Sequence, residues 1–132
     1  MFECRLPLAS EIGSARLGRQ AVRDVLIDCD PEFVDRAVIL TDELVTNAIR
    51  HGRPPIVLML SGNADTLDVG VCDAGAGVPG GQAVEWTEER GRGLMIVAAL
   101  SDEWGVCTRR PGKCVWFHLE VSSVPVGSPV PG

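Results

Sequence analysis

The spacing of apolar residues predicts a strand and then a helix near the N-terminus. Apolar and polar residues alternate loosely over Phe2–Leu8, which is typical of a short strand. From Ser10 or Glu11 up to Pro31, apolar residues recur at steps of three and four, which predicts a first helix. The residues of this apolar stripe are Ile12, Ala15, Leu17, Ala21, Val22, Val25 and Leu26.

A second, longer helix is predicted from Asp30 to Gly52. Asp30 can cap the free amides of the first turn, and Pro31 suits the first helical position. Apolar residues continue at helical spacing up to Gly52, and Pro54 and Pro55 prevent the helix from continuing. We expect this helix to be mostly buried, because apolar residues occupy more than one narrow face.

Four further segments predict two hairpins. Ile56–Leu60 is a continuous apolar run, Leu67–Val71 alternates toward Asp73, and turn residues separate the two. Trp104–Thr108 and Lys113–Val121 are rich in β-branched and aromatic residues and flank a second turn. Each pair is typical of two adjacent strands joined by a tight connection.

The remaining segments predict a loop, a third helix and a tail. Residues 74–90 are rich in Gly, Pro and acidic side chains, and a helical pattern resumes at Leu94. Residues 122–132 are rich in Pro, Gly and Ser and are expected to be disordered, which leaves residues 1–121 as one domain. The order of elements predicts an α/β (α+β) two-layer sandwich: a mixed, mostly antiparallel sheet covered on one face by three helices.

The composition fits one globular domain and argues against several classes of function. Of the 132 residues, 45% are hydrophobic and 23% are charged. The formal net charge of -6 argues against broad binding of nucleic acid or anionic lipid. Neither a secretory signal nor a membrane span is recognisable. We therefore expect a cytoplasmic protein without direct contact to nucleic acid or membranes.

The cysteines show no spacing that is typical of a metal site. Cys4, Cys29, Cys72, Cys107 and Cys114 include no CxxC pair, and the chain has only 2 His. We expect reduced and mostly buried thiols that take no part in chemistry.

Two glycine-rich stretches approach known phosphate-binding motifs but lack the right context. Residues 13–20 (GSARLGRQ) come close to a P-loop, but Arg19 and Gln20 replace its Lys and hydroxyl, and the segment lies in a predicted helix. Residues 75–80 match GxGxxG after a strand, but neither a helix nor a parallel βαβ unit follows. We assign neither motif.

Polar residues at four-residue steps mark one side of the second helix. Glu43, Asn47 and His51 stack along this side, because a helix turns once in about 3.6 residues. A hydrated Mg²⁺ would suit the carboxylate and the carboxamide, since magnesium prefers oxygen ligands. Taken alone, however, this spacing is very common and favours a polar helix side or a local capping network over a metal site.

Two later segments supply further parts of a nucleotide site. Asp73 ends a strand and can accept a hydrogen bond from an exocyclic amine, while Gly75 and Gly77 let the backbone approach a flat base. Gly91–Leu94 opens the third helix, where free amides attract phosphate. Three motifs in this order point to a purine nucleotide.

These motifs resemble those of the superfamily that unites gyrase, histidine kinases and MutL, and within it the anti-sigma-factor serine kinases of Gram-positive bacteria. Residues 43–52 (ELVTNAIRHG) resemble the first box, residues 73–77 the second and residues 91–94 the third, while residues 112–117 resemble the closing strand. The resemblance covers about residues 2–121. It implies the Bergerat-type ATP-binding fold.

The resemblance also implies roles for individual residues. Glu43 would be the general base, Asn47 would hold the Mg²⁺ that bridges the ATP phosphates, and Asp73 would bind the adenine amine. Residues 78–90 would form the ATP lid. The other expected nucleotide-binding residues are His51, Gly75, Gly77, Gly91, Arg92, Gly93, Leu94 and Cys114.

Cys114 departs from the family pattern, because relatives often have Thr near this position. A thiol is a weaker donor and acceptor than the hydroxyl that can serve the adenine through water. We expect reduced adenine affinity or selectivity from this change.

By resemblance, the chain is an ATP- and Mg²⁺-dependent serine/threonine protein kinase that regulates transcription as a homodimeric anti-sigma factor. Its expected partners are an anti-anti-sigma protein of the STAS type, which it phosphorylates, and a sigma factor. The alternative is an ATP-binding or degenerate regulator that binds a partner without transferring phosphate.

Overall fold

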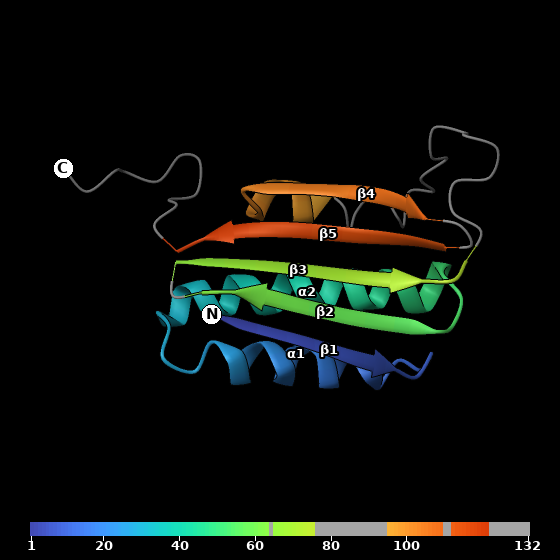
Figure 1. Ribbon diagram of the computed structural model, residues 1–132, viewed down its shortest axis with the longest axis horizontal. Helices are drawn as coiled ribbons and strands as arrows, with labels where there is room; N and C mark the ends of the chain where they lie inside the picture. The colour runs from blue at the N-terminus through green and yellow to red at the C-terminus, as the bar shows by residue number, and fades with distance from the viewer. Residues whose placement is uncertain (64, 76–94, 110–111, 122–132) are drawn as a thin grey trace.

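Five antiparallel strands form one sheet in the part of the chain that the structure describes, which comprises residues 1–63, 65–75, 95–109 and 112–121 of a computed structural model. The strands are β1 (Phe2–Leu8), β2 (Ile56–Gly62), β3 (Thr66–Asp73), β4 (Glu103–Arg109) and β5 (Gly112–Glu120). Their order across the sheet is β1-β2-β3-β5-β4 (Figure 1).

The helices cover one face of this sheet, as expected for a two-layer α+β sandwich. They are α1 (Ser14–Val25), α2 (Pro31–His51) and a third helix described over residues 95–100 (Figure 1). We call the face that packs against the helices the inner face and the opposite one the outer face. None of the described helices is long and apolar enough to cross a membrane.

The two-layer fold is as predicted, but the sheet, which was expected to be mixed and mostly antiparallel, has only antiparallel pairings among the described strands. The segment between β1 and β2 contains two helices and not one crossover helix. This helix pair returns the chain to the end where β1 finished, so Leu8 pairs with Ile56. The two predicted hairpins, β2–β3 and β4–β5, are confirmed.

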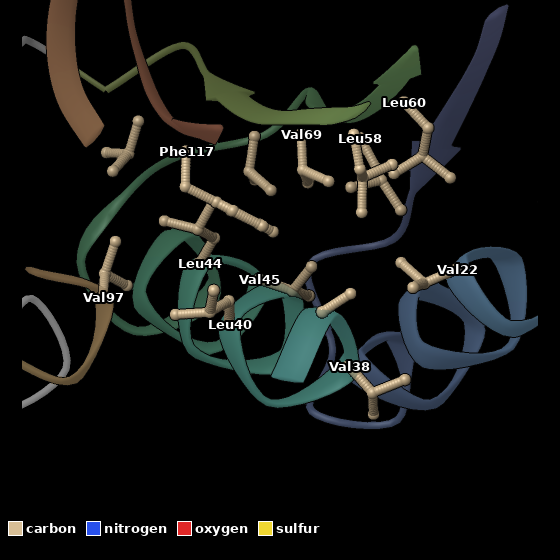
Figure 2. Packing of buried hydrophobic residues seen from close by; sticks show 14 of the residues in the cluster. Val22, Val38, Leu40, Leu44, Val45, Leu58, Leu60, Val69, Val97 and Phe117 are labelled. Carbon is tan, nitrogen blue, oxygen red and sulfur yellow. The ribbon is translucent and has the colours of Figure 1, made fainter. Parts of the chain in front are cut away.

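The core lies between the inner face and the helices. Leu58, Val69 and Phe117 project from the sheet toward Leu44 and Val45 of α2 (Figure 2), and all five are at most 1% exposed. Burial of each large apolar side chain stabilises the fold by about 1.5–3 kcal/mol. This packing fixes α2 against β3 and β5.

The start of α2 was predicted correctly, whereas the start of α1 was not. Asp30 caps α2 by accepting a hydrogen bond from the Phe33 amide at 3.4 Å, and Pro31 occupies the first turn, as predicted. The first helix starts later than expected, at Ser14. Its hydroxyl donates to the Ala9 carbonyl at 2.7 Å, which stabilises a turn before the helix and leaves Ile12 exposed.

Several predictions fall outside the described residues. They concern most of the loop at 74–90, the start of the third helix and the tail at 122–132. The domain boundary at residue 121 therefore stays a prediction.

Candidate functional site

Asp73 lies at the C-terminal end of β3, where several contacts hold its carboxylate. Its carboxylate is 2% exposed and forms an ion pair with Lys113 of β5, with 3.1 Å between Nζ and Oδ2. Oδ1 accepts hydrogen bonds from the backbone amides of Gly75 at 2.7 Å and Arg53 at 3.2 Å. Groups from three separate segments therefore orient this carboxylate.

The end of α2 lies directly against Asp73. A Cβ added to Gly52 would lie 2.4 Å from Asp73 Cγ, and one added to Gly75 would lie 2.7 Å from Oδ1. The Ala74 amide also donates to the Arg53 carbonyl at 2.8 Å. The first and second motifs of the sequence thus meet in space, and glycine is required where they touch.

The two carboxylate oxygens of Asp73 differ in what they bind. Oδ1 accepts from two backbone amides, and Lys113 Nζ lies farther from it, at 3.4 Å, than from Oδ2. A carboxylate oxygen has two lone pairs. Among the described contacts, Oδ2 has Lys113 as its partner, which leaves capacity for one more donor. A single exocyclic amine would match that capacity.

Lys113 was missed at the sequence level as part of the site. Along β5 it shares the buried alternation of Val115, Phe117 and Leu119, so a lysine occupies a core-facing position. A buried ammonium group needs a counter-charge, which is the signal that could have indicated its role.

Glu43 and Asn47 lie on one side of α2, next to its buried stripe. Both are half-buried, and by helical geometry both lie on the same side as Leu40. Figure 2 shows Leu40 toward Phe117 and Val97 of the third helix, and Val38 on the side of α1. The two polar residues therefore lie on the flank of α2 away from α1, on the side of Val97 in the third helix.

The environment of Glu43 favours its protonated form. Burial raises the pKa of this carboxyl, and the negative charge of Asp42 raises it further, while Arg50 lowers it. A carboxylate with a raised pKa is a stronger base once it is ionised.

His51 closes α2 one turn after Asn47 and is half-buried beside Gly52. Since about 1.5 Å of helix separates successive residues, Asn47 and Gly52 lie about 7.5 Å apart along the axis. Asp73, which touches Gly52, is therefore at the same end of α2 as the polar residues.

Cys114 differs from its predicted state. It forms a disulfide with Cys72, so it has no thiol hydrogen to donate, and the expectation of reduced cysteines was wrong for this pair. Cys114 also alternates with the inner-face residues Lys113 and Val115 and thus lies on the outer face. The expected role of its thiol beside the adenine is corrected accordingly.

Other predicted site residues lie outside the described part of the chain. They are Gly77, Gly91, Arg92, Gly93 and Leu94. Their roles stay predictions.

The polar side chains of the described site fit a nucleotide with a bound metal ion. Asp73 offers a buried acceptor with spare capacity, as an adenine amine needs. Glu43 and Asn47 offer half-buried side-chain oxygens, which are the ligands that Mg²⁺ prefers.

Comparison with known families defines the class of protein. Residues 8–119 match the family described as histidine kinase-like ATPase domain. The chain therefore belongs to the histidine kinase-like ATPase family, as its motifs predicted.

A solved structure gives a more particular likeness. The crystal structure of the RsbU and RsbW domains of Rv1364c from Mycobacterium tuberculosis is similar, with a TM-score of 0.68 and 22% sequence identity. The match covers 90% of this chain and 32% of that chain. At this identity the likeness shows the fold, and this chain spans about a third of the larger protein. A comparison with curated proteins found no match.

Proposed function

We propose that the chain binds ATP with Mg²⁺ and transfers the γ-phosphoryl group to a serine or threonine hydroxyl of an anti-anti-sigma protein. The observation that carries this proposal is the junction of α2 with β3, where Gly52 and Gly75 close on the Asp73 carboxylate. Family membership supports the ATP site, and the likeness to a structure with an RsbW domain supports the regulatory role.

Asp73 would recognise the adenine. Oδ2 would accept the hydrogen bond of the exocyclic amine, because Oδ1 is already engaged by two amides. Lys113 would keep the carboxylate in place, as its ion pair with Asp73 is almost fully buried. Gly77 would give the ring room by the resemblance.

Asn47 would hold Mg²⁺, which neutralises phosphate charge when it is bound. The backbone of Gly91, Gly93 and Leu94, with the charge of Arg92, would contact the phosphates, and His51 would line the same end of α2. These assignments follow the family motifs residue by residue.

Glu43 would accept the proton of the attacking hydroxyl. Its raised pKa makes the ionised carboxylate a better proton acceptor than an ordinary surface glutamate. The remaining catalysis would come from positioning of the two reactants and from neutralisation of charge.

The partners proposed are a STAS-type anti-anti-sigma protein as phosphate acceptor and a sigma factor as the protein that the kinase sequesters. ATP would favour one partner over the other, which would give a partner switch in transcription regulation. A homodimer is proposed from the resemblance alone.

The test begins with a pull-down on the immobilised chain, with and without ATP–Mg²⁺. The retained STAS-type protein is purified and incubated with γ-labelled ATP and either wild type or Glu43→Gln. We expect label on a serine or threonine with wild type and about 10²–10⁴-fold slower labelling with the variant. Glu32→Gln, the same change at an exposed position of α2, is the matched control and should label normally.

Two results would contradict the proposal in different ways. Retention of a partner and binding of ATP without any label would favour the regulator that binds without transferring phosphate. Equal labelling by Glu43→Gln and wild type would remove Glu43 from the role of base.

A further inference from the structure

Three cysteines from three strands form one row on the outer face of the sheet. In the strand register Cys114 of β5 is opposite Cys72 of β3 on one side and opposite Cys107 of β4 on the other. Residues directly opposite each other in an antiparallel sheet project from the same face. The three side chains are therefore neighbours in the order Cys72, Cys114, Cys107.

The members of this row differ in chemical state. Cys72 and Cys114 form a disulfide, whereas Cys107 is a free and exposed thiol. A thiol beside a disulfide is the arrangement that thiol–disulfide exchange requires. Cys4 and Cys29 are also free but belong to β1 and to the segment after α1.

The sheet geometry allows Cys114 to bridge to either neighbour. In an antiparallel sheet the amide and the carbonyl of one residue point to the same neighbouring strand. A residue of a central strand therefore forms a hydrogen-bonded pair with one neighbour and a non-hydrogen-bonded pair with the other. The Cα atoms of Cys72 and Cys114 are 4.0 Å apart, which matches the closer, non-hydrogen-bonded kind.

Hydrogen bonds at the other end of β5 agree with this assignment. The Val121 amide donates to the Asp65 carbonyl on the β3 side, and the Glu120 amide donates to Asp102 on the β4 side. The backbone amides and carbonyls of the even-numbered residues of β5 thus point toward β4. Cys114 and Cys107 are then a hydrogen-bonded pair, with Cα atoms about 5.5 Å apart, which is within the range of disulfides.

We propose that this row is a thiol–disulfide exchange site in which Cys107 attacks the Cys72–Cys114 disulfide. The Cys107 thiolate forms a bond to Cys114 Sγ, the Cys72–Cys114 bond breaks, and Cys72 leaves as a thiolate that takes up the proton Cys107 lost. One disulfide and one thiol exist before and after the step, so no external oxidant or reductant is needed.

Cys114 is the sulfur common to both forms. Cys72 and Cys107 are separated by two strand spacings, about 9.5 Å, which is too far for a direct bridge. The exchange therefore has two forms, Cys72–Cys114 and Cys107–Cys114.

The surroundings favour departure of Cys72. A groove of about 320 Å³ runs along the disulfide and is lined by Cys72, Cys114 and Arg5; Asp73 and Lys113 also line it, but their charges neutralise each other in the buried ion pair, which leaves Arg5 as the cation beside the disulfide. Cationic side chains near a sulfur stabilise its thiolate, which makes it a better leaving group. The row also directly adjoins the Asp73–Lys113 pair, so exchange changes the covalent tie between the two strands that carry this pair.

The experiment maps the disulfides of the full chain without reductant. Protein held at about pH 8, where thiolate attack is favoured, is denatured in excess N-ethylmaleimide, digested and analysed by mass spectrometry. We expect both bridged forms in wild type, with alkylated Cys72 in one and alkylated Cys107 in the other. Cys107→Ser should show the Cys72–Cys114 bridge alone. Cys72→Ser lacks the starting disulfide, so it is incubated with glutathione disulfide as the oxidant and should then show the Cys107–Cys114 bridge.

Cys29→Ser is the control for unspecific shuffling and should leave both forms in the wild-type ratio. The proposal is overturned if wild type shows the Cys72–Cys114 bridge alone after prolonged incubation, or if Cys72→Ser forms no bridge to Cys107. It is equally overturned if all three thiols are alkylated, or if Cys4 or Cys29 bridges to Cys114 as often as Cys107 does.

Discussion

The two ends of the candidate site are built in different ways. At β3, Asp73 is fixed by Lys113 and by two backbone amides before any ligand arrives. On α2, Glu43 is half-buried, and the charges that act on it come from its own helix, Asp42 and Arg50. The proposed adenine-binding end is therefore held by tertiary contacts, whereas the proposed catalytic end is tuned by local burial and charge.

This difference explains which substitutions should damage the fold and which should damage function alone. A change at Asp73 leaves a buried cation without its partner, so it affects stability as well as binding. A change at Glu43 alters a partly exposed side chain, so it should affect chemistry more than folding. Substitutions at the two ends should therefore separate stability from chemistry.

Asp73→Asn should give the largest loss of stability. Removal of one partner of a buried ion pair typically costs about 3–5 kcal/mol, because the other charge stays buried. Urea unfolding followed by circular dichroism measures this loss. Asp73→Asn combined with Lys113→Met should recover most of the stability, because both charges are gone, yet should not recover ATP binding. An unchanged unfolding midpoint for the single variant would contradict the buried pair.

Gly52→Ala should moderately reduce both the stability of the fold and the binding of ATP. The new Cβ would meet the Asp73 carboxylate and the Ala48 carbonyl at 2.4–2.6 Å, so the end of α2 must move away from β3. Overpacking of this kind costs about 1–3 kcal/mol.

Gly13→Ala is the matched control for Gly52→Ala. A Cβ at Gly13 has nothing within 4 Å, so this change should alter unfolding by less than about 0.5 kcal/mol. Equal behaviour of the two variants in urea would disprove the close contact between Gly52 and Asp73.

The pH dependence of phosphate transfer should show the smallest effect. Glu43 must be ionised to accept a proton, so the rate should rise with pH through the raised pKa of this residue. Asp42→Asn removes a neighbouring negative charge and should move the rise to lower pH, whereas Arg50→Gln should move it to higher pH. The rates are measured with labelled ATP at subsaturating ATP. Shifts in the opposite directions would show that another group limits the rate.

Much of the fold could be predicted from the sequence, because its signals are local. The cap of α2 at Asp30 and the two hairpins depend on residues close together in the chain, and all three are confirmed. The sheet was expected to be mixed and mostly antiparallel; that β1 and β2 also pair in antiparallel fashion depends on how the two helices between them pack, which no local pattern specifies. The start of α1 was misplaced because a turn held by Ser14 precedes it.

The parts of the site that could not be predicted depend on strand register. Lys113 meets Asp73, and Cys114 meets Cys72, only because β5 pairs with β3 in one register out of several. A one-residue slip would exchange the two faces, and no local pattern specifies the register between segments that lie 40 residues apart. The contact of Gly52 with Asp73 likewise follows from the packing of α2 on the sheet.

The most direct test of the central claim is a calorimetric titration of ATP, with and without Mg²⁺, into wild type and Asn47→Ala. If α2 and the end of β3 form one site for ATP–Mg²⁺, wild type binds ATP in a magnesium-dependent way and Asn47→Ala loses this binding while it keeps its fold. Thr46→Ala, a change at the adjacent half-buried position, should bind as wild type does. Equal, magnesium-dependent affinity in wild type and Asn47→Ala would contradict the account.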